Sequence, residues 1–371
     1  MKHGTPPGLA FLDDALAAAA REDLLRVRPL PGRQVPSFCS NDYLGLGARM
    51  APVEASGAGA SRLVCGEHAA HVALERACAE WVGASAALVF TSGYAANVGL
   101  VSALAGPDDL IVSDALNHAS LIDGCRLSRG RVVVAAHRDV AAVERALAGR
   151  RPGRAFVVTE SYFSMDADAP DLAALRRICD AAGAALVVDE AHALGVLGPE
   201  GRGLCAEASV TADGLTGTLG KAFGAGGAFV AGCPALVAWL WNRARSFVFS
   251  TGLSPVVAAA GLAGLVAARE EPELRRRVLA NATRFRQGLL DEGIRTLGFG
   301  PIIPWVIGDV SRALRVAEEL RDAGVDVRAI RPPTVPAGTA RIRFTVTAAI
   351  EPDAVDRAVA MIARVARRNP A

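Results

Sequence analysis

Short apolar runs alternate with helix-like segments between about residues 40 and 251. Valine, leucine and phenylalanine fill these runs almost continuously, as expected for strands that are buried on both faces. Alternation at this spacing predicts an α/β fold in which helices cover a mostly parallel sheet. Ligands of such sheets lie beyond the carboxyl ends of the strands, so we expect site residues directly after these runs. The runs are 87–90, 110–112, 131–135, 155–159, 185–188 and 228–231.

The pattern changes near residue 253, where a long helical region begins and continues through the charged stretch 270–286. Shorter strands then follow, which indicates a smaller α+β domain. The expected strands are 304–307, 325–329 and 340–345. The expected domains are an N-terminal arm over 1–39 with a helix at about 9–25, a large domain over 40–252 and a small domain over 253–371.

The composition excludes several classes of function. A formal net charge of +2 gives no strongly basic face for nucleic acid. The 7 cysteines include no CxxC pair, and no third ligand accompanies His68 and His71, so we expect no metal site. Unpaired cysteines and the absence of a secretory signal favour a cytoplasmic protein. The uncharged stretch 246–268 contains Pro255 and many alanines, and it predicts a connector and core helix rather than a membrane span.

Asp189 directly follows one of the buried runs, in the segment 186–192 (LVVDEAH). An unpaired charge is costly there, so this carboxylate requires a cationic partner. The nitrogen of a pyridinium ring is one candidate. A purely structural role for a carboxylate at a strand end is an equally good interpretation of this pattern alone.

Lys221 lies among glycines in the segment 218–227 (TLGKAFGAGG), after a strand-like run. A nucleotide-binding P-loop requires glycine six positions before its lysine and Ser or Thr after it, where this chain has Leu215 and Ala222. A lysine held in a tight turn and partly desolvated is instead suited to forming a Schiff base.

Gly93 and Tyr94 lie where a helix is expected to begin, in the segment 91–97 (TSGYAAN). Backbone amides at a helix N-terminus can bind a phosphate, although an ordinary helix cap would look the same. Phe90 stands where a nucleophile elbow requires glycine, which excludes that motif. His118 lies near the start of the next helix, where it could also be a capping or core residue.

Together these segments resemble the α-oxoamine synthases, which are pyridoxal-phosphate (PLP) enzymes of the aspartate-aminotransferase fold, fold type I. The similarity extends from Ser40 nearly to the C-terminus. The matching motifs are 40–46 (SNDYLGL), 117–120 (NHAS), 163–166 (FSMD), 189–192 (DEAH) and 220–224 (GKAFG). Within the family, the segment 331–339 (RPPTVPAGT) is most similar to members that condense L-alanine with a pimeloyl thioester of CoA or a carrier protein in biotin synthesis.

The resemblance implies a role for each matching residue. Lys221 would hold the cofactor as a Schiff base and act as general base, Asp189 would pair with the ring nitrogen, and His118 would stack on the ring. The residues implied to contact the cofactor elsewhere are His192 and Ser164 at the phenolic oxygen, and Gly93, Tyr94 and Thr218 at the phosphate.

The resemblance also implies substrate contacts and a homodimer. The implied substrate residues are Asn41 and Arg343 at the amino-acid carboxylate, with Arg26 and Thr334 elsewhere on the substrate, while Ser250 and Thr251 would reach the phosphate of the neighbouring subunit. Two departures from the family pattern, in 57–62 (GAGASR) and at 161, 162 and 167, bear on acyl-chain preference.

Three alternatives remain open at this point. A sister enzyme of the family would use glycine or serine, as glycine C-acetyltransferase, 5-aminolevulinate synthase and serine-using acyltransferases do. A module with this fold that binds cofactor or a partner without catalysis is the second. A P-loop protein is the third, and Leu215 and Ala222 disfavour it.

Overall fold

The computed structural model describes residues 56–369, together with Ala17, 21–23, Phe38, Tyr43, Leu44 and Leu46. These residues divide into two compact units. The larger contains 56–281 and 347–349 with Tyr43, Leu44 and Leu46, and the smaller contains 282–346 and 350–369 with Phe38. The expected helix at about 9–25 falls almost entirely outside the described residues.

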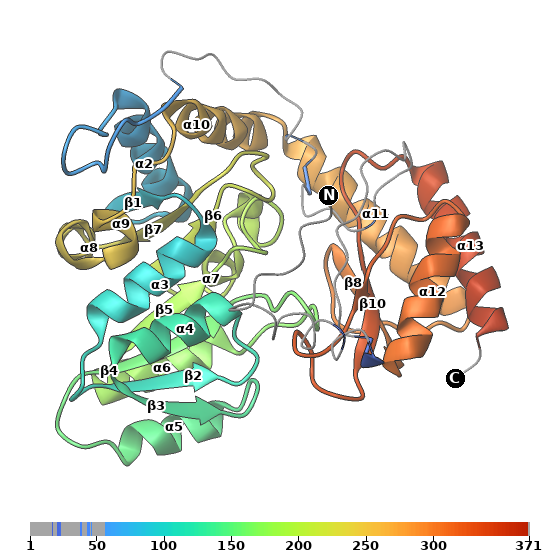
Figure 1. Ribbon diagram of the computed structural model, residues 1–371, viewed down its shortest axis with the longest axis horizontal. Coiled ribbons are helices and arrows are strands. Elements are labelled where there is room, and N and C mark those ends of the chain that lie inside the picture. Colours follow the sequence, from blue (N-terminus) through green and yellow to red (C-terminus); the bar gives the residue numbers. More distant parts are fainter. Residues whose placement is uncertain are drawn as a thin grey trace, which may run out of the picture. The chain divides into compact units, whose positions relative to one another are not determined.

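A seven-stranded sheet forms the centre of the larger unit, in the order β1-β7-β6-β5-β4-β2-β3 (Figure 1). Within this sheet, β7 runs antiparallel to both of its neighbours, and the other recorded strand pairs are parallel. The expected mostly parallel sheet is therefore confirmed. The strands are β1 (Ala86–Phe90), β2 (Leu110–Asp114), β3 (Arg131–Ala135), β4 (Ala155–Glu160), β5 (Ala185–Asp189), β6 (Gly214–Thr218) and β7 (Ala228–Gly232).

Helices cover both faces of this sheet. Ile111 and Phe156 pack with residues of α3 (Gly93–Leu104) and α4 (Ala119–Ser128), because they share one apolar cluster. The next residues along the same strands face the opposite way, toward α5 (Val140–Ala148) and α6 (Leu172–Ala182), as the alternation of strand side chains requires. The remaining helices are α2 (Ala69–Val82), α7 (Leu204–Glu207), α8 (Pro234–Arg243), α9 (Arg245–Val248), α10 (Pro255–Glu270) and a 3₁₀ turn at Pro199–Gly201.

Local sequence signals set the ends of these helices. Asp139 and Asp171 cap the starts of α5 and α6, each accepting a hydrogen bond from the backbone amide three residues later. Gly183 ends α6 in the left-handed conformation, which favours glycine. The expected helix at 172–182 therefore has its observed bounds.

Two expectations about the strands require correction. Strand β6 was expected only as a strand-like run before Lys221, without bounds, because its sequence GLTGT is neither apolar nor alternating. It is nevertheless buried, and a Cβ on Gly217 would lie 2.4 Å from the Phe229 ring. Strand β3 lies at the sheet edge and is mostly exposed, whereas burial on both faces was expected.

The smaller unit contains a three-stranded antiparallel sheet in the order β8-β10-β9. Its strands are β8 (Ile302–Gly308), β9 (Ala329–Ile330) and β10 (Ala340–Thr345), with helices α12 (Val310–Asp322) and α13 (Pro352–Arg368). The strand expected at 325–329 is wrong over most of its length. Val325 and Val327 are buried in the small core, but the backbone contact of Asp326 is an isolated one, to the amide of Phe38 at 3.0 Å.

Helix α11 (Pro272–Asp291) continues from the larger unit into the smaller one at residues 281 and 282. Helix α10 belongs to the larger unit because it packs on α2. Domain boundaries at 39/40 and 252/253 remain a prediction that differs from this division. Within the described residues, no helix combines the length and the apolar character that crossing a membrane requires.

Candidate active site

Asp189 and Lys221 lie at the carboxyl ends of neighbouring parallel strands. Asp189 is the last residue of β5, and it pairs in register with Thr216 of β6. Lys221 lies three residues beyond the end of β6, in a turn that is closed by the amide of Gly224 donating to the Lys221 carbonyl at 3.1 Å. Both residues therefore lie where a sheet of this kind binds its ligand.

The Asp189 carboxylate is buried, with 7% of the residue exposed. The Asn97 side-chain amide donates to Oδ2 at 2.7 Å, and the backbone amide of Ala191 donates to Oδ1 at 2.8 Å. Both donors are neutral. The carboxylate is thus oriented by hydrogen bonds while its charge is suited to a cationic ligand.

His118 is the N-cap residue of α4, so the alternative capping role is also real. Its Nδ1 accepts from the Ser120 backbone amide at 3.2 Å and lies 2.8 Å from Ser120 Oγ. Burial of the ring among its neighbours lowers the pKa of His118, the Asp189 carboxylate opposes this change, and the Lys221 ammonium adds to it. Asp189 and Lys221 thus act on one imidazole, as the implied roles require.

Glu160 is a site residue that sequence reasoning missed. It is the last residue of β4, it is 5% exposed, and its Oε1 accepts from the backbone amide of His118 at 2.7 Å. Burial first and the Asp189 charge second raise the pKa of Glu160 to about 8, against the opposing charge of Lys221. The signal that singled out Asp189, a carboxylate directly after a buried run, was equally present at Glu160.

His192 and Ser164 are both buried at 8% exposure. The hydroxyl of Tyr43 lies 2.9 Å from His192 Nδ1. Ser164 lies in a turn that is closed by the backbone amide of Phe163, which donates to the Asp168 carbonyl at 2.9 Å.

A second group that the sequence did not reveal is centred on His137 and contacts Asp168, whose carbonyl closes the turn that contains Ser164. His137 lies between two carboxylates, with Nδ1 2.9 Å from Asp114 and Nε2 3.1 Å from Asp168. Burial lowers the pKa of His137, but the hydrogen bonds and charges of Asp114 and Asp168 outweigh it and raise the pKa to about 9. Sequence patterns gave no sign of this cluster, because its members are far apart along the chain.

Gly93 and Tyr94 begin α3, and Thr218 ends β6. A Cβ on Gly93 would lie 3.9 Å from Thr218 Oγ1, so the helix start faces the threonine hydroxyl. The first amides of a helix have no partner within the helix. The Tyr94 side chain itself turns to Asp123, with a 2.5 Å hydrogen bond between hydroxyl and carboxylate.

These residues fit a phosphorylated pyridinium cofactor. A buried carboxylate with neutral donors suits a protonated ring nitrogen, and a helix start beside a hydroxyl, with room above Gly93, suits a phosphate. A lysine in the next turn supplies the amine. The donor set therefore agrees with the expected cofactor.

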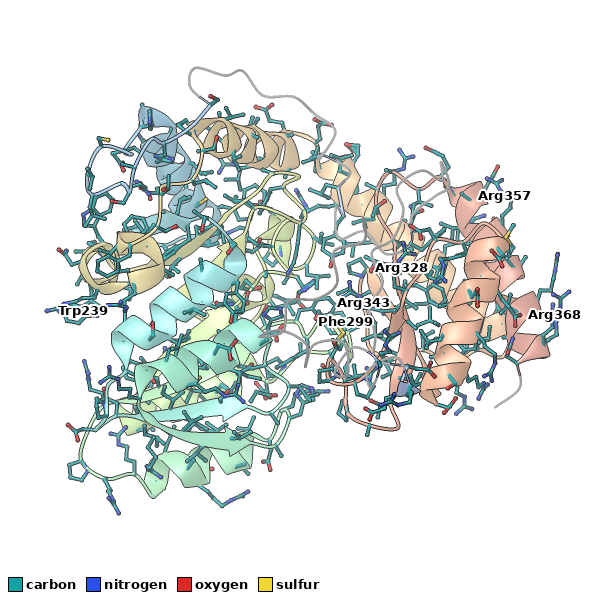
Figure 2. The ribbon with its side chains drawn as sticks, viewed as in Figure 1. Trp239, Phe299, Arg328, Arg343, Arg357 and Arg368 are labelled. Atoms are coloured by element: carbon teal, nitrogen blue, oxygen red, sulfur yellow. The ribbon has the colours of Figure 1, made fainter. Side chains whose placement is uncertain are left out.

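The resemblance also implies roles for six further residues. Arg26 and Asn41 lie outside the described residues. Arg343 is half-buried on β10 opposite Pro304, where Figure 2 labels it, and Thr334 is exposed; both belong to the smaller unit. Ser250 and Thr251 line a small pocket of the larger unit beside Arg62 and Phe90.

The sequence model of the family 'Aminotransferase class I and II' matches residues 33–362 of this chain. The chain is 47% identical over 346 residues to an 8-amino-7-oxononanoate synthase of Marinobacter nauticus, covering 90% of this chain and 88% of the relative. It is also 47% identical over 351 residues to an enzyme of the same name from Geobacter sulfurreducens, covering 91% and 90%.

Solved structures agree on the fold. A serine palmitoyltransferase of Sphingomonas wittichii superposes with a TM-score of 0.89 at 28% identity, covering 99% of both chains. An 8-amino-7-oxononanoate synthase of Francisella tularensis superposes with a TM-score of 0.75 at 26% identity, covering 90% of this chain and 98% of the other. The chain therefore belongs to the class I and II aminotransferase family and, within it, to the 8-amino-7-oxononanoate synthases among the α-oxoamine synthases.

Proposed function

We propose that this enzyme condenses L-alanine with a pimeloyl thioester to give 8-amino-7-oxononanoate, CO2 and the free thiol, as a step of biotin synthesis. The observation that carries the proposal is the position of Asp189 at the end of β5 and of Lys221 just after the neighbouring strand β6, with both charges acting on His118. Relatives at 44 to 49% identity carry the name of this activity. The cofactor is PLP, which supplies an electron sink for a negative charge on the amino-acid Cα when it is bound.

Each residue has a defined part in this proposal. Lys221 would hold the cofactor through its aldehyde, and the Lys221 amine would take the proton from the alanine Cα. Asp189 would pair with the ring nitrogen and favour its protonation, and His118 would lie against the ring face. The proposed contacts to the phenolic oxygen and the phosphate are those of Ser164 and His192, and of Gly93, Tyr94 and Thr218, respectively.

The atoms of the reaction balance without an oxidant. A bond forms between the alanine Cα and the acyl carbonyl carbon, and the carbon–sulfur bond breaks as the thiol leaves. The bond from Cα to the carboxylate then breaks with release of CO2, and a proton returns to Cα. The chain must therefore exclude water from a strong carbon base, which suits the buried positions of Asp189, Glu160 and Ser164.

Further parts of the proposal concern residues beyond this core. Asn41 and Arg343 would bind the substrate carboxylate, while Arg26 and Thr334 would contact other parts of the substrate. A homodimer in which Ser250 and Thr251 approach the neighbouring active site, and a cytoplasmic location, complete the proposal.

A panel of substrates tests the activity. Alanine, glycine and serine are each presented with pimeloyl, acetyl, succinyl and palmitoyl thioesters of CoA, and with pimeloyl-carrier protein, and products are identified by mass. We expect 8-amino-7-oxononanoate from alanine and a pimeloyl donor to exceed every other product. Preference for serine with palmitoyl-CoA would instead assign the chain the activity named for its structural neighbour.

A further inference from the structure

A chain of hydrogen bonds connects Asp189 to His118 through two residues to which no role has been assigned above. The Asn97 amide nitrogen lies 2.7 Å from Asp189 Oδ2 and 2.9 Å from Ser120 Oγ. Ser120 Oγ in turn lies 2.8 Å from His118 Nδ1. Asn97 lies on α3 and Ser120 on α4, and both are buried, at 1% and 0% exposure.

The chemistry of the groups fixes the direction of each bond. An amide nitrogen can only donate, so the two hydrogens of Asn97 go to the Asp189 carboxylate and to Ser120 Oγ. Ser120 Oγ therefore accepts from Asn97. Because the backbone amide of Ser120 makes His118 Nδ1 an acceptor, the hydroxyl hydrogen of Ser120 is donated to that nitrogen. The backbone amide of Ser120 donates to the same nitrogen. Two donors on Nδ1 leave the imidazole proton on Nε2.

We propose that Asn97 and Ser120 are positioning residues: Asn97 fixes the carboxylate that faces the ring nitrogen of the cofactor, and the pair together hold His118 as a neutral Nε2–H imidazole. This inference rests on the proposed roles of Asp189 and His118. A neutral imidazole can lie over a cationic ring without repulsion, whereas an imidazolium could not.

Packing alone does not account for Asn97. Its neighbours on the buried face of α3 include Ala96 and Leu100, so an apolar residue would fill this position at less cost. Its own Oδ1 is buried without a hydrogen-bond partner among the described residues, which is a cost that packing does not offset. The amide nitrogen is thus the part of the side chain that the site uses.

The titratable groups around His118 are Asp189 on β5, Lys221 in the turn after β6, and Glu160 on β4, which accepts from the backbone amide of His118. Of these, Lys221 opposes protonation of the ring and Asp189 favours it. The Ser120 hydroxyl donates to His118 Nδ1, and this hydrogen bond also favours the neutral ring. Loss of its hydroxyl should therefore raise the pKa of His118 with Asp189 and Lys221 still in place.

Two variants separate the effect on the Asp189 carboxylate from the effect on the His118 ring. Asn97→Leu keeps a side chain of similar volume and removes the donors to both Asp189 and Ser120. Ser120→Ala removes the donor to His118 and the acceptor for Asn97, but keeps the Asn97 donor to Asp189. Ser102→Ala is the matched control, because Ser102 is also on α3 and its hydroxyl bonds only the Val98 carbonyl among the described residues. All are prepared as PLP-loaded enzyme. Cofactor affinity is measured by equilibrium dialysis, and the His118 protonation state by ¹⁵N NMR, with His118→Gln for assignment.

We expect Asn97→Leu to weaken PLP affinity about tenfold or more and Ser120→Ala to change it less than about twofold. We expect Ser120→Ala to raise the His118 pKa while the proton of the neutral ring stays on Nε2, because the backbone amide of residue 120 still donates to Nδ1. We expect Ser102→Ala to change neither the PLP affinity nor the His118 pKa. Unchanged PLP affinity in Asn97→Leu, or an unchanged His118 spectrum in Ser120→Ala, would overturn the inference. If Asn97→Leu does not fold, the His118 spectrum of Ser120→Ala decides. Borohydride labelling of Lys221 in the unmodified enzyme tests the cofactor assignment separately.

Discussion

Glu160 and Asp189 are register partners at the carboxyl ends of the parallel strands β4 and β5. Both are buried, and the negative charge of Asp189 makes a second charge on Glu160 unfavourable. With a pKa of about 8, Glu160 stays protonated near neutral pH while Asp189 has the Asn97 and Ala191 donors. The edge of the sheet thus has two neighbouring buried carboxyl groups, and the strongly raised pKa of Glu160 beside Asp189 is a pattern typical of active sites.

Glu160→Gln should reduce the dependence of stability on pH. Between pH 4.5 and about 8 the folded chain binds a proton on Glu160 that the unfolded chain has lost, so the free energy of unfolding falls as pH rises. Glutamine is neutral throughout, so the variant should lose this slope and gain roughly a few kcal/mol relative to the unmodified chain at pH 8. Urea unfolding of the cofactor-free protein from pH 4.5 to 8.5 measures this effect.

Glu144→Gln on the exposed face of α5 is the control for that comparison. It should leave the pH dependence as it is in the unmodified chain. Equal slopes for Glu160→Gln and the unmodified chain would show that Glu160 is ionised in the folded state at neutral pH.

His137→Gln should destabilise the protein below pH 9 and have less effect above it. The folded pKa of about 9 lies above the ordinary value of 6.5, so the stabilisation is fully present below pH 6.5 and is lost as pH rises through 9. The shift corresponds to about 3 kcal/mol at low pH. Thermal unfolding at pH 6 and pH 9.5 measures the difference, and protease cleavage within 163–168 reports on the Ser164 turn.

The His137 and Glu160 effects act in the same direction over overlapping pH ranges. A double variant separates them, because the two side chains are not hydrogen-bonded to each other among the contacts recorded for the described residues. The two groups share Asp114, which pairs with His137 and also raises the pKa of Glu160, so any departure from additive losses of slope measures their coupling. A His137→Gln variant as stable as the unmodified protein at pH 6 would contradict the charged state of His137.

The sequence predicted the sheet and its catalytic edge because buried strands have a strong apolar signal. Strand 131–135 and helix 172–182 have their predicted bounds, and Asp189 ends β5 as predicted. The bounds of strand β6 could not be predicted from an apolar pattern. Gly214 and Gly217 occupy positions where there is little room for a side chain, since a Cβ at either would crowd neighbouring side chains. The local sequence pattern gives no indication of such a steric constraint.

The supporting residues of the site could not be predicted for a related reason. Asn97 and Ser120 are polar residues inside ordinary helices. Asn97 bonds Asp189 and Ser120 only after α3 and α4 pack together on the sheet. Glu160 could have been found, because it ends its strand as Asp189 does. The contrast indicates that residues at strand ends can be read from sequence, whereas hydrogen-bond partners from other elements cannot.

Gly264→Ala should disturb the Lys221 turn from a distance. Gly264 lies on α10, and a Cβ there would lie 2.0 Å from the carbonyl oxygen of Phe223, two residues after Lys221. Either the helix or the turn must move, at a cost of about 1–3 kcal/mol. We expect a lower melting temperature and weaker PLP retention in dialysis.

Gly261→Ala on the same helix is the matched control. Its Cβ would contact only the flexible ends of Leu219 and Leu74, at 3.3 Å or more, and alanine is the better helix former by about 1 kcal/mol. It should therefore retain PLP and be nearly as stable as the unmodified enzyme. Equal retention of PLP by both variants would show that α10 does not constrain the Lys221 turn.

The scarcity of lysine makes the cofactor attachment directly testable. The chain contains 40 Lys and Arg residues, but Lys2 and Lys221 are the only lysines. Reduction of the PLP-loaded enzyme with borohydride should therefore fix the label on one peptide, the one that contains Lys221. Lys221→Ala should lose this label and lower turnover by about a thousandfold or more, because the variant lacks both the attachment amine and the base that acts on the alanine Cα.

Lys2→Ala should keep the label and full turnover, which separates loss of a specific amine from loss of any lysine. Asp189→Asn is informative beside it. Asparagine keeps the size of the side chain but cannot hold a proton on the ring nitrogen, so labelling at Lys221 should persist while turnover falls. Label on Lys221 together with undiminished turnover in Asp189→Asn would show that the carboxylate has only a structural role. Label on Lys2 in the unmodified enzyme would reject Lys221 as the attachment point.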